Sequence, residues 1–240
     1  FAVGVDEMSW DDLDEAHYKW PTVARTQAYR DIVHEKVNVL IDLLTLILPI
    51  TQDSPWWVIL MGIEHENIHL ETSSVLIRQL PLDFIKEHEA WKECDTVAVA
   101  PQNTFIDVAA GNVVLGKNRD ANYFGWDNEY GEHHADIPAF KAAKYLTSNG
   151  EFLEFVKDGG YTNDTFWSQE GQAWKSYTLS EYPLFWRKDG DDYRLRTLSR
   201  EISLPLNWPV EVNHLEAEAF CRWKSEKDGV NITLPTEDEY

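Results

Sequence analysis

Apolar residues recur at helical spacing in the segment 56–81, "WWVILMGIEHENIHLETSSVLIRQLP". At about 100° per residue, one stripe of this helix carries mostly apolar positions together with two histidines, His65 and His69. The stripe consists of Val58, Met61, Gly62, His65, Ile68, His69, Thr72 and Leu76. Ser54 is the expected N-cap and Pro55 the first helical residue. The pattern therefore predicts a helix that turns both imidazoles toward the protein interior, one turn apart.

An earlier stretch, "TVARTQAYRDIVHEKVNVLIDLLTLILP", has the pattern of a second long helix. Thr22 is its expected N-cap and Pro49 marks its end. Apolar residues at three- and four-residue steps, typical of a bundle helix, are Val33, Val37, Leu40, Leu44 and Ile47. Because a short loop joins the two helices, we expect them to pack antiparallel in a helical bundle.

The sequence pattern changes from helical to mixed after about residue 92. "TVAVAPQNTFIDVAAGNVVLGKN" contains short β-prone runs broken by glycine and asparagine. A short helix is expected from Ser148 to the pair Gly159-Gly160. "EVNHLEAEAFCRWKSEKDG" predicts another helix, whose buried side carries Leu215, Ala219, Phe220 and Trp223. The rest, rich in Trp and Tyr, is expected to be loop. The chain is predicted to be α+β, a helical bundle over residues 1–92 and an irregular α+β domain over 93–240.

Composition narrows the classes of function. The 42 acidic residues outnumber the 21 basic ones and give a net charge of −21. Such a field repels phosphate backbones and anionic lipid, so neither nucleic acid nor a membrane is an expected partner. Two cysteines form no disulfide framework, and the longest apolar run is too short to span a bilayer. We expect a cytoplasmic protein. Eleven Trp and ten Tyr suggest aromatic-lined surfaces or pockets.

His65 and His69 are the strongest chemical signal. One turn apart on a helix, their Cβ atoms are about 6 Å from each other, which lets both imidazoles reach one ion at roughly 2.1 Å. The alternative is a pair of core histidines, each satisfied by a backbone carbonyl. Two buried imidazoles on one apolar face each need a partner of their own, and a shared metal supplies both. The spacing therefore predicts a metal-ligand pair.

The string also matches H-E-x-x-H, the motif of zinc peptidases, in which Glu66 would be the general base. That scheme needs a third ligand further along, and no motif of that kind follows. A zinc peptidase is thus a second hypothesis. Other polar residues are expected to have structural or solvated roles. They are His34 and His88 on charged surfaces, His133 and His134 in a loop, Asp127, Asn128 and Glu129 in a turn, and Cys221 in a packed helix face.

Several strings resemble a known family. "GIEHENIHLETSSVLIRQLP" is similar to the metal helix of the DinB-like bundle in nonheme-iron sulfoxide synthases. "GWDNEYG", "SNGEFLEFVKDGGY" and "WPVEVNHLEAEAFCRW" through "LPTEDEY" resemble the second domain of these enzymes, which is of the formylglycine-generating-enzyme (sulfatase-modifying) type. The strings "VDEMSWDDL" and "HLETSSVLIRQLP" are nearly those of the 5-histidylcysteine sulfoxide synthases of ovothiol biosynthesis. The resemblance covers essentially all 240 residues.

The resemblance implies a fold and an iron site. It implies a DinB-like bundle followed by a C-type-lectin-like domain, both expected to be truncated here. The family holds Fe(II) with three histidines, two of which match His65 and His69. The third is expected upstream of Phe1, and the family's proton-donor tyrosine beyond Tyr240. The piece of 240 residues alone is therefore expected neither to retain iron tightly nor to make product.

The implied reaction is the O₂-dependent coupling of L-cysteine to the imidazole carbon of L-histidine, the first step of ovothiol biosynthesis. Three neutral imidazoles leave Fe(II) with open positions at which the two substrates and O₂ can meet. Three alternatives stay open. The first is the sister enzyme of the ergothioneine pathway, which uses trimethylhistidine. The others are the zinc peptidase and a non-catalytic lectin-like binding module.

Overall fold

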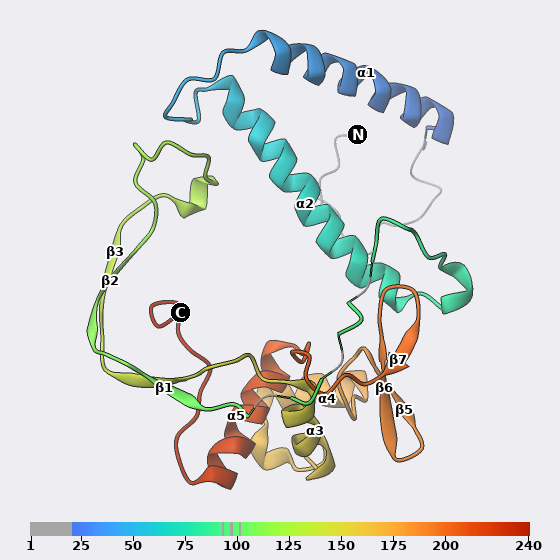
Figure 1. The fold of residues 1–240 in the computed structure, drawn as a ribbon, viewed down its shortest axis with the longest axis vertical. Helices are drawn as coiled ribbons and strands as arrows, with labels where there is room; N and C mark the ends of the chain where they lie inside the picture. The colour runs from blue at the N-terminus through green and yellow to red at the C-terminus, as the bar shows by residue number, and fades with distance from the viewer. Residues whose placement is uncertain (1–20, 93, 97, 101) are drawn as a thin grey trace. The chain divides into compact units, whose positions relative to one another are not determined.

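The structure is a computed structural model that describes residues 21–92, 94–96, 98–100 and 102–240. His17 and the string "VDEMSWDDL" lie outside the described residues. The chain divides into two units. Figure 1 shows the order of their helices and strands along the chain. The first contains the described residues up to Ile63 together with Asp120–Phe124, and the second contains Glu64–Arg119 and Gly125–Tyr240. No helix in the described part of the chain is both long enough and apolar enough to cross a membrane.

Helix α1 (Val23–Leu43) begins at the expected residue but ends early. The Thr22 hydroxyl accepts a hydrogen bond from the Arg25 amide at 3.3 Å, as expected of an N-cap. The helix stops at Leu43 rather than Pro49, and Leu44 is extended. A proline restricts only the residue before it, so Pro49 sets an outer limit to the helix and not its end. The carbonyl of Thr45, freed from the helix, accepts a hydrogen bond from Trp56 Nε1 at 3.2 Å.

Helix α2 (Pro55–Gln79) begins where the sequence predicts. The Ser54 hydroxyl accepts a hydrogen bond from the Trp56 amide at 3.3 Å, and Pro55 occupies the first helical position. No residue of α1 is buried, and the antiparallel packing of the two helices stays a prediction. The apolar stripe of a helix is buried only where another element packs against it. The spacing of apolar residues in the sequence does not show which element that is.

Two antiparallel ribbons in the second unit follow the β-prone runs. Strand β1 (Phe105–Val108) pairs with β4 (Phe140–Ala143), and β2 (Gly111–Leu115) pairs with β3 (His133–Ile137). In the second ribbon Val113 lies opposite Ala135. The described residues of "TVAVA" form no strand, although their composition favours one. The 133–143 segment was expected to be loop. It is strand because pairing with distant partners decides the state of such short runs.

A third sheet has the order β5–β6–β7. Its strands are Trp186–Asp189, Asp192–Arg196 and Glu201–Ser203, all paired antiparallel. This region was also expected to be loop. The strands are three to five residues long and carry charged side chains, so their sequence alone gives no clear alternation.

Helix α3 (Asn149–Lys157) confirms the expected helix after Ser148. The Ser148 hydroxyl accepts from the Glu151 amide, and the Glu151 carboxylate accepts in turn from the Ser148 amide, which completes a capping box. Each of the two glycines that follow is required for a different structural reason. Gly159 has a φ of +81°, and a Cβ at Gly160 would lie 2.3 Å from the Phe155 ring. The "DGGY" turn thus lets the chain double back against its own helix.

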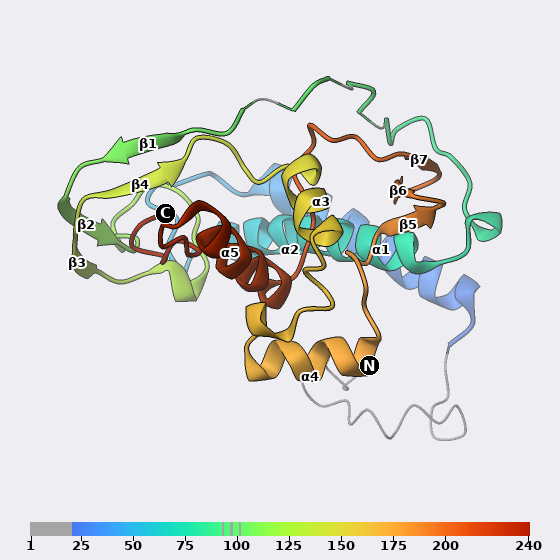
Figure 2. The same cartoon turned by 90° about the horizontal axis from the view of Figure 1, so that it is seen from below.

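Helices α4 (Gln169–Thr178) and α5 (His214–Asp228) complete the unit (Figure 2). Helix α4 lies in a region expected to be loop, because its glycine and many polar residues obscure the helical spacing of its apolar positions. Helix α5 was predicted, and its buried side includes Ala219, Phe220 and Trp223 as expected. Its last turn ends at Gly229, which has a left-handed conformation.

The core of the second unit is aromatic. Phe152 stacks on Phe220 with ring centroids 5.4 Å apart, and Phe155 meets the Trp223 ring edge-on at 5.7 Å. The buried aromatic residues are Phe152, Phe155, Tyr161, Phe166, Trp167, Phe185, Trp186, Phe220 and Trp223. The expectation that the aromatic residues line surfaces or pockets is thus wrong for these nine. They are the interior that holds α3 and α5 together.

Candidate metal centre

His65 and His69 lie on one face of α2 but not in the interior. Both are exposed, as are their stripe neighbours Val58 and Leu76, at 57% and 64%. The expectation that the helix turns these imidazoles into a core is therefore wrong for the part of the chain described. The stripe is an open apolar face with two imidazoles on it.

The two rings have the separation that a shared ion would require. Their centroids are 4.5 Å apart and their planes nearly perpendicular, at 86°. Two imidazoles bound to one ion at roughly 2.1 Å, about 90° apart, have centroids about 4.5 Å from each other. An edge-to-face contact between aromatic rings has a similar separation. The geometry therefore permits a metal-ligand pair and does not by itself require one.

The opposite face of the same helical segment is fastened to the lectin-like part of the second unit. Val75 packs against the aromatic core. Arg78 Nε donates to the carbonyl of Arg196 at 3.1 Å, and Arg78 Nη1 donates to Glu211 Oε2 at 2.6 Å. The sequence gives no sign of this role for Arg78, because its partners lie more than one hundred residues away.

No group of three His, Cys, Asp or Glu side chains able to hold a metal occurs among the described residues. His133 and His134 are exposed on strand β3, where successive side chains point to opposite faces. Their imidazoles lie 3.3 Å from an Asp238 oxygen and 2.5 Å from a Glu132 oxygen. The two pair with separate carboxylates, and the surface role expected for them holds, though on a strand and not in a loop.

The acidic turn after Trp126 is a structural device. Asp127–Glu129 forms the short 3-10 helix η4. The Glu129 carboxylate accepts a hydrogen bond from the Trp126 amide at 2.6 Å, and the Glu129 carbonyl accepts from the Lys117 amide at 2.9 Å. These contacts fix the loop, in agreement with the structural role expected for this turn.

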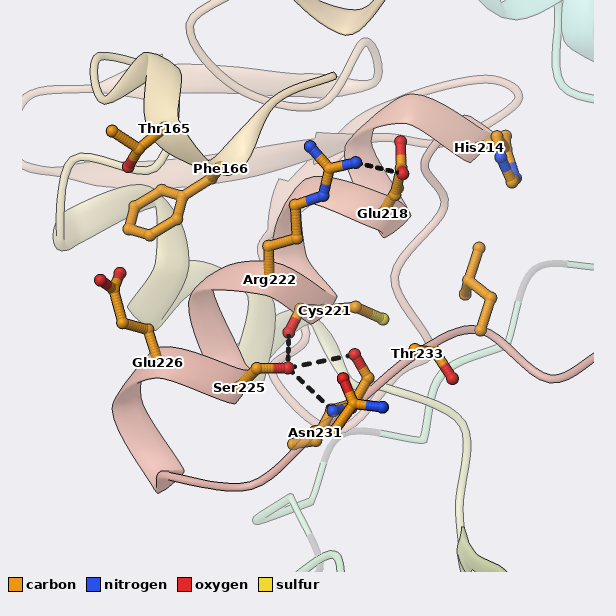
Figure 3. Close-up of a pocket in the computed structure, with 12 residues that line it drawn as sticks. Thr165, Phe166, His214, Glu218, Cys221, Arg222, Ser225, Glu226, Asn231 and Thr233 are labelled. Atoms are coloured by element: carbon orange, nitrogen blue, oxygen red, sulfur yellow. Dashed lines mark hydrogen bonds and ion pairs between the residues drawn. The ribbon is translucent and has the colours of Figure 1, made fainter.

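Cys221 packs as expected. It is buried on α5, and burial, with a smaller contribution from the Glu218 carboxylate, raises the pKa of its thiol. It lines a groove of about 770 Å³, shown in Figure 3. Within the groove Arg222 donates to Glu218 at 2.5 Å, and the Ser225 hydroxyl donates to the Cys221 carbonyl at 2.8 Å. These groups partner one another, and a thiol with a raised pKa is a weak ligand and nucleophile.

A buried acid–phenol pair was not foreseen in the sequence. The Tyr161 hydroxyl donates to Glu216, and the second Glu216 oxygen accepts from the Asn213 amide at 2.9 Å. Burial raises the pKa of Glu216, while its hydrogen bonds to Tyr161 and Asn213 lower it. Burial, reinforced by the carboxylate, raises the pKa of Tyr161. The N-x-x-E spacing of a capping box was the available signal, and it predicts Glu216 at a helix start but not its burial.

Comparison with known proteins gives a family and several relatives. The sequence profile of the family described as the sulfatase-modifying factor enzyme 1-like domain matches residues 91–240. The chain is 31% identical over 196 residues to the hercynine oxygenase of Mycolicibacterium smegmatis, covering 79% of this chain and 42% of that protein. It is 35% identical over 129 residues to the hercynine oxygenase of Mycobacterium tuberculosis, covering 53% of this chain and 28% of that protein.

A fungal relative is more distant. The ergothioneine biosynthesis protein 1 of Neurospora crassa is 24% identical over 172 residues, covering 65% of this chain and 19% of that protein. The chain thus spans less than half the length of each of these relatives.

Proposed function

Because the chain belongs to the sulfatase-modifying factor enzyme 1-like domain family, and its relatives include hercynine oxygenases, we propose that it is part of an iron-dependent oxidoreductase. The proposed reaction is the O₂-dependent formation of a carbon–sulfur bond between a cysteine-type thiol and the imidazole of a histidine derivative, with oxidation to the sulfoxide. The observation that carries the proposal is the pair of imidazoles on α2, 4.5 Å apart.

His65 and His69 are the residues proposed to hold the iron. Neutral imidazoles suit Fe(II), and the ring separation fits two ligands of one ion. The chemistry that iron supplies in such a site is the activation of O₂ beside bound substrates. The described residues offer no third donor next to the pair. We propose that it comes from another part of the protein, as the resemblance to the sulfoxide synthases implies, and that the family's proton-donor tyrosine does too.

The role of this chain in the reaction is placement. A 25-residue helix is a rigid support for two ligands one turn apart. The exposed apolar side chains that surround the pair, such as Leu76 and Ile68, provide a face from which water can be excluded once it is covered. Holding the thiol and the imidazole carbon in contact raises the rate by replacing a bimolecular encounter with a fixed geometry.

Two histidine-type substrates are candidates for this reaction, L-histidine and hercynine. The strings shared with the 5-histidylcysteine sulfoxide synthases favour L-histidine and a place in ovothiol biosynthesis. The names of the relatives favour hercynine, the trimethylated histidine, and a place in ergothioneine biosynthesis. The two substrates differ only at the α-nitrogen, where hercynine carries a fixed positive charge with no N–H donor.

The experiment is a product assay with the full-length protein, reconstituted with Fe(II) under anaerobic conditions. L-Cysteine, O₂ and either L-histidine or hercynine are added, and products are identified by mass spectrometry. A sulfoxide adduct with either substrate supports the proposal, and the ratio of the two rates assigns the pathway. If neither substrate gives an adduct, the proposed function is overturned. Retention of zinc with cleavage of a peptide would support the zinc peptidase, and absence of any metal would support a lectin-like binding module.

A further inference from the structure

Arg78 makes an unusual set of contacts for a residue near the end of a helix. Its guanidinium carbon lies 3.6 Å from the centroid of the Phe185 ring, in cation–π contact. Its Nε donates to the Arg196 carbonyl, and its Nη1 donates to the Glu211 carboxylate. The side chain is only 15% exposed. A planar guanidinium held on its face and at two of its nitrogens has little freedom to change its orientation.

Arg196 completes the arrangement from the other side. This arginine, on strand β6, is 2% exposed. Its Nη2 donates to the carbonyl of Leu80 at 3.2 Å, just beyond the end of α2. Its Nη1 donates to the carbonyls of Thr197 and Leu198, the latter at 2.9 Å. Each arginine thus donates to a backbone carbonyl of the other's segment, and we call this pair of contacts the arginine clasp. Figure 1 shows the end of α2 beside the β5–β6–β7 sheet.

The clasp and the histidines lie on opposite faces of the helix. Arg78 is nine positions beyond His69, which at about 100° per position places it about 180° round the helix and about 14 Å along it. The burial pattern agrees. Ser74, Val75 and Arg78 are partly buried, while Thr72 and Leu76 are exposed with the histidines. A slip of one residue in this contact would turn the imidazoles by about 100°.

We propose that Arg78 is a positioning residue for the histidine pair. By fastening one face of α2 to Arg196, Glu211 and Phe185, it sets the rotation and the axial register of the helix. His65 and His69 then project from the lectin-like domain in one fixed direction. The consequence for catalysis rests on the proposed function. The fastening itself does not, and the experiment separates the two.

The test compares variants of the full-length protein. Arg78→Met keeps the apolar stem and removes the guanidinium, and Arg78→Lys keeps the charge for Glu211 but cannot reproduce the planar fork. The matched control is Arg187→Met. Arg187 also donates to two backbone carbonyls, those of Leu184 and Trp186, and lies near Glu201, and none of these three partners is on α2.

Hydrogen–deuterium exchange measures the fastening without reference to activity. In Arg78→Met, amides of residues 64–80 are expected to exchange about tenfold faster or more, because charged hydrogen bonds to the helix are lost. Exchange in α3 and α5 should not change. In Arg78→Lys the exchange rate of residues 64–80 should lie between those of the wild type and Arg78→Met. In Arg187→Met it should equal that of the wild type. Unchanged exchange in 64–80 in both Arg78 variants, or an equal rise throughout the domain, would overturn the proposal.

Iron content and turnover measure the positioning. Arg78→Met should retain iron, because both imidazoles are present, while its turnover number falls about tenfold or more. Lysine should restore part of the turnover. A turnover number equal to that of the wild type, with faster exchange in α2, would overturn the positioning role. If the wild-type protein forms no sulfoxide, the proposed function fails, and the exchange data still decide whether Arg78 fastens the helix.

Discussion

Helices α1 and α5 have similar sequence signals and different surroundings. Both have an N-cap side chain that accepts a hydrogen bond from a backbone amide, and both carry apolar residues at helical spacing. Yet α1 has 21 residues and none buried, whereas α5 has 15 residues and five buried. The difference lies in what surrounds them. The rings of α5 pack against those of α3, whereas the apolar residues of α1 stay unburied.

The contrast shows that periodicity predicts a helix and one side of it, but not a partner for that side. In the lectin-like unit the partners follow within the same segment of sequence, between residues 148 and 228. No residue of α1 is buried, and both histidines of α2 are exposed. The stabilising term that depends on burial is accordingly concentrated in the second unit.

Removing a buried ring should have the largest effect. Phe155 is fully buried, and its change to alanine is expected to lower the free energy of unfolding by about 3–5 kcal/mol. Leu40, which is 42% exposed on α1, should lose less than about 1 kcal/mol on the same change. Chemical denaturation of each variant measures both. Equal losses would show that α1 is packed in solution as tightly as the aromatic core.

Removing the N-cap side chain should also destabilise the protein more at α5 than at α1, by a smaller amount than the loss of a buried ring. Asn213→Ala removes the side chain that accepts from the Glu216 amide and is expected to cost about 1–2 kcal/mol. Thr22→Ala removes the equivalent contact at α1 and should leave the cooperative unfolding midpoint unchanged, since α1 frays without exposing a core. The same denaturation experiment tests both. A comparable shift of the midpoint with Thr22→Ala would argue against an unpacked α1.

The pH dependence of stability should reveal the buried acid. Burial raises the pKa of Glu216 above its ordinary value of 4.5, so the folded protein holds a proton there that the unfolded chain releases. The contribution of Glu216 is therefore present below about pH 4.5 and is lost as the pH rises through the folded pKa. Glu216→Gln should remove this term. Unfolding free energies of both proteins, measured from pH 4.5 to 8, should differ increasingly in favour of the glutamine variant. A constant difference would contradict the raised pKa.

An exposed glutamate should behave differently. Glu66 lies about 100° round α2 from His65 and is exposed. Glu66→Gln is therefore expected to leave iron binding intact and to reduce turnover only modestly. Parallel assays of iron content and product formation check this. Loss of all turnover with iron still bound would indicate that Glu66 is an acid–base residue, as in the peptidase hypothesis.

The sequence was most informative where a motif is local. Thr22, Ser54 and Ser148 each mark the start of a helix, because a cap and its amide lie within three residues. It was least informative where distant segments pair. The strands at 186–203 and the clasp between Arg78 and Arg196 depend on partners that no short window contains. The aromatic residues were visible in the composition, but their burial was not, because the same residues occur in cores and in pockets.

In the candidate site, too, the local feature was predictable from the sequence and the long-range contacts were not. The spacing of His65 and His69 predicts that both lie on one helix face, and the structure places them there, 4.5 Å apart. Whether that face is covered depends on other elements, and periodicity alone wrongly placed it in the interior. The fastening of the opposite face by Arg78 could not be foreseen either, since the residue reads as an ordinary charge on a polar side.

The most direct test is the iron affinity of the full-length protein and its histidine variants. Anaerobic titration with Fe(II) should give one iron per chain for the wild type and for the controls His34→Ala and His88→Ala, whose imidazoles are exposed elsewhere. His65→Ala and His69→Ala should each bind iron at least about 100-fold more weakly, because loss of a direct ligand costs more than loss of a residue behind one. Wild-type affinity in both single variants would contradict the assignment of these two histidines as iron ligands.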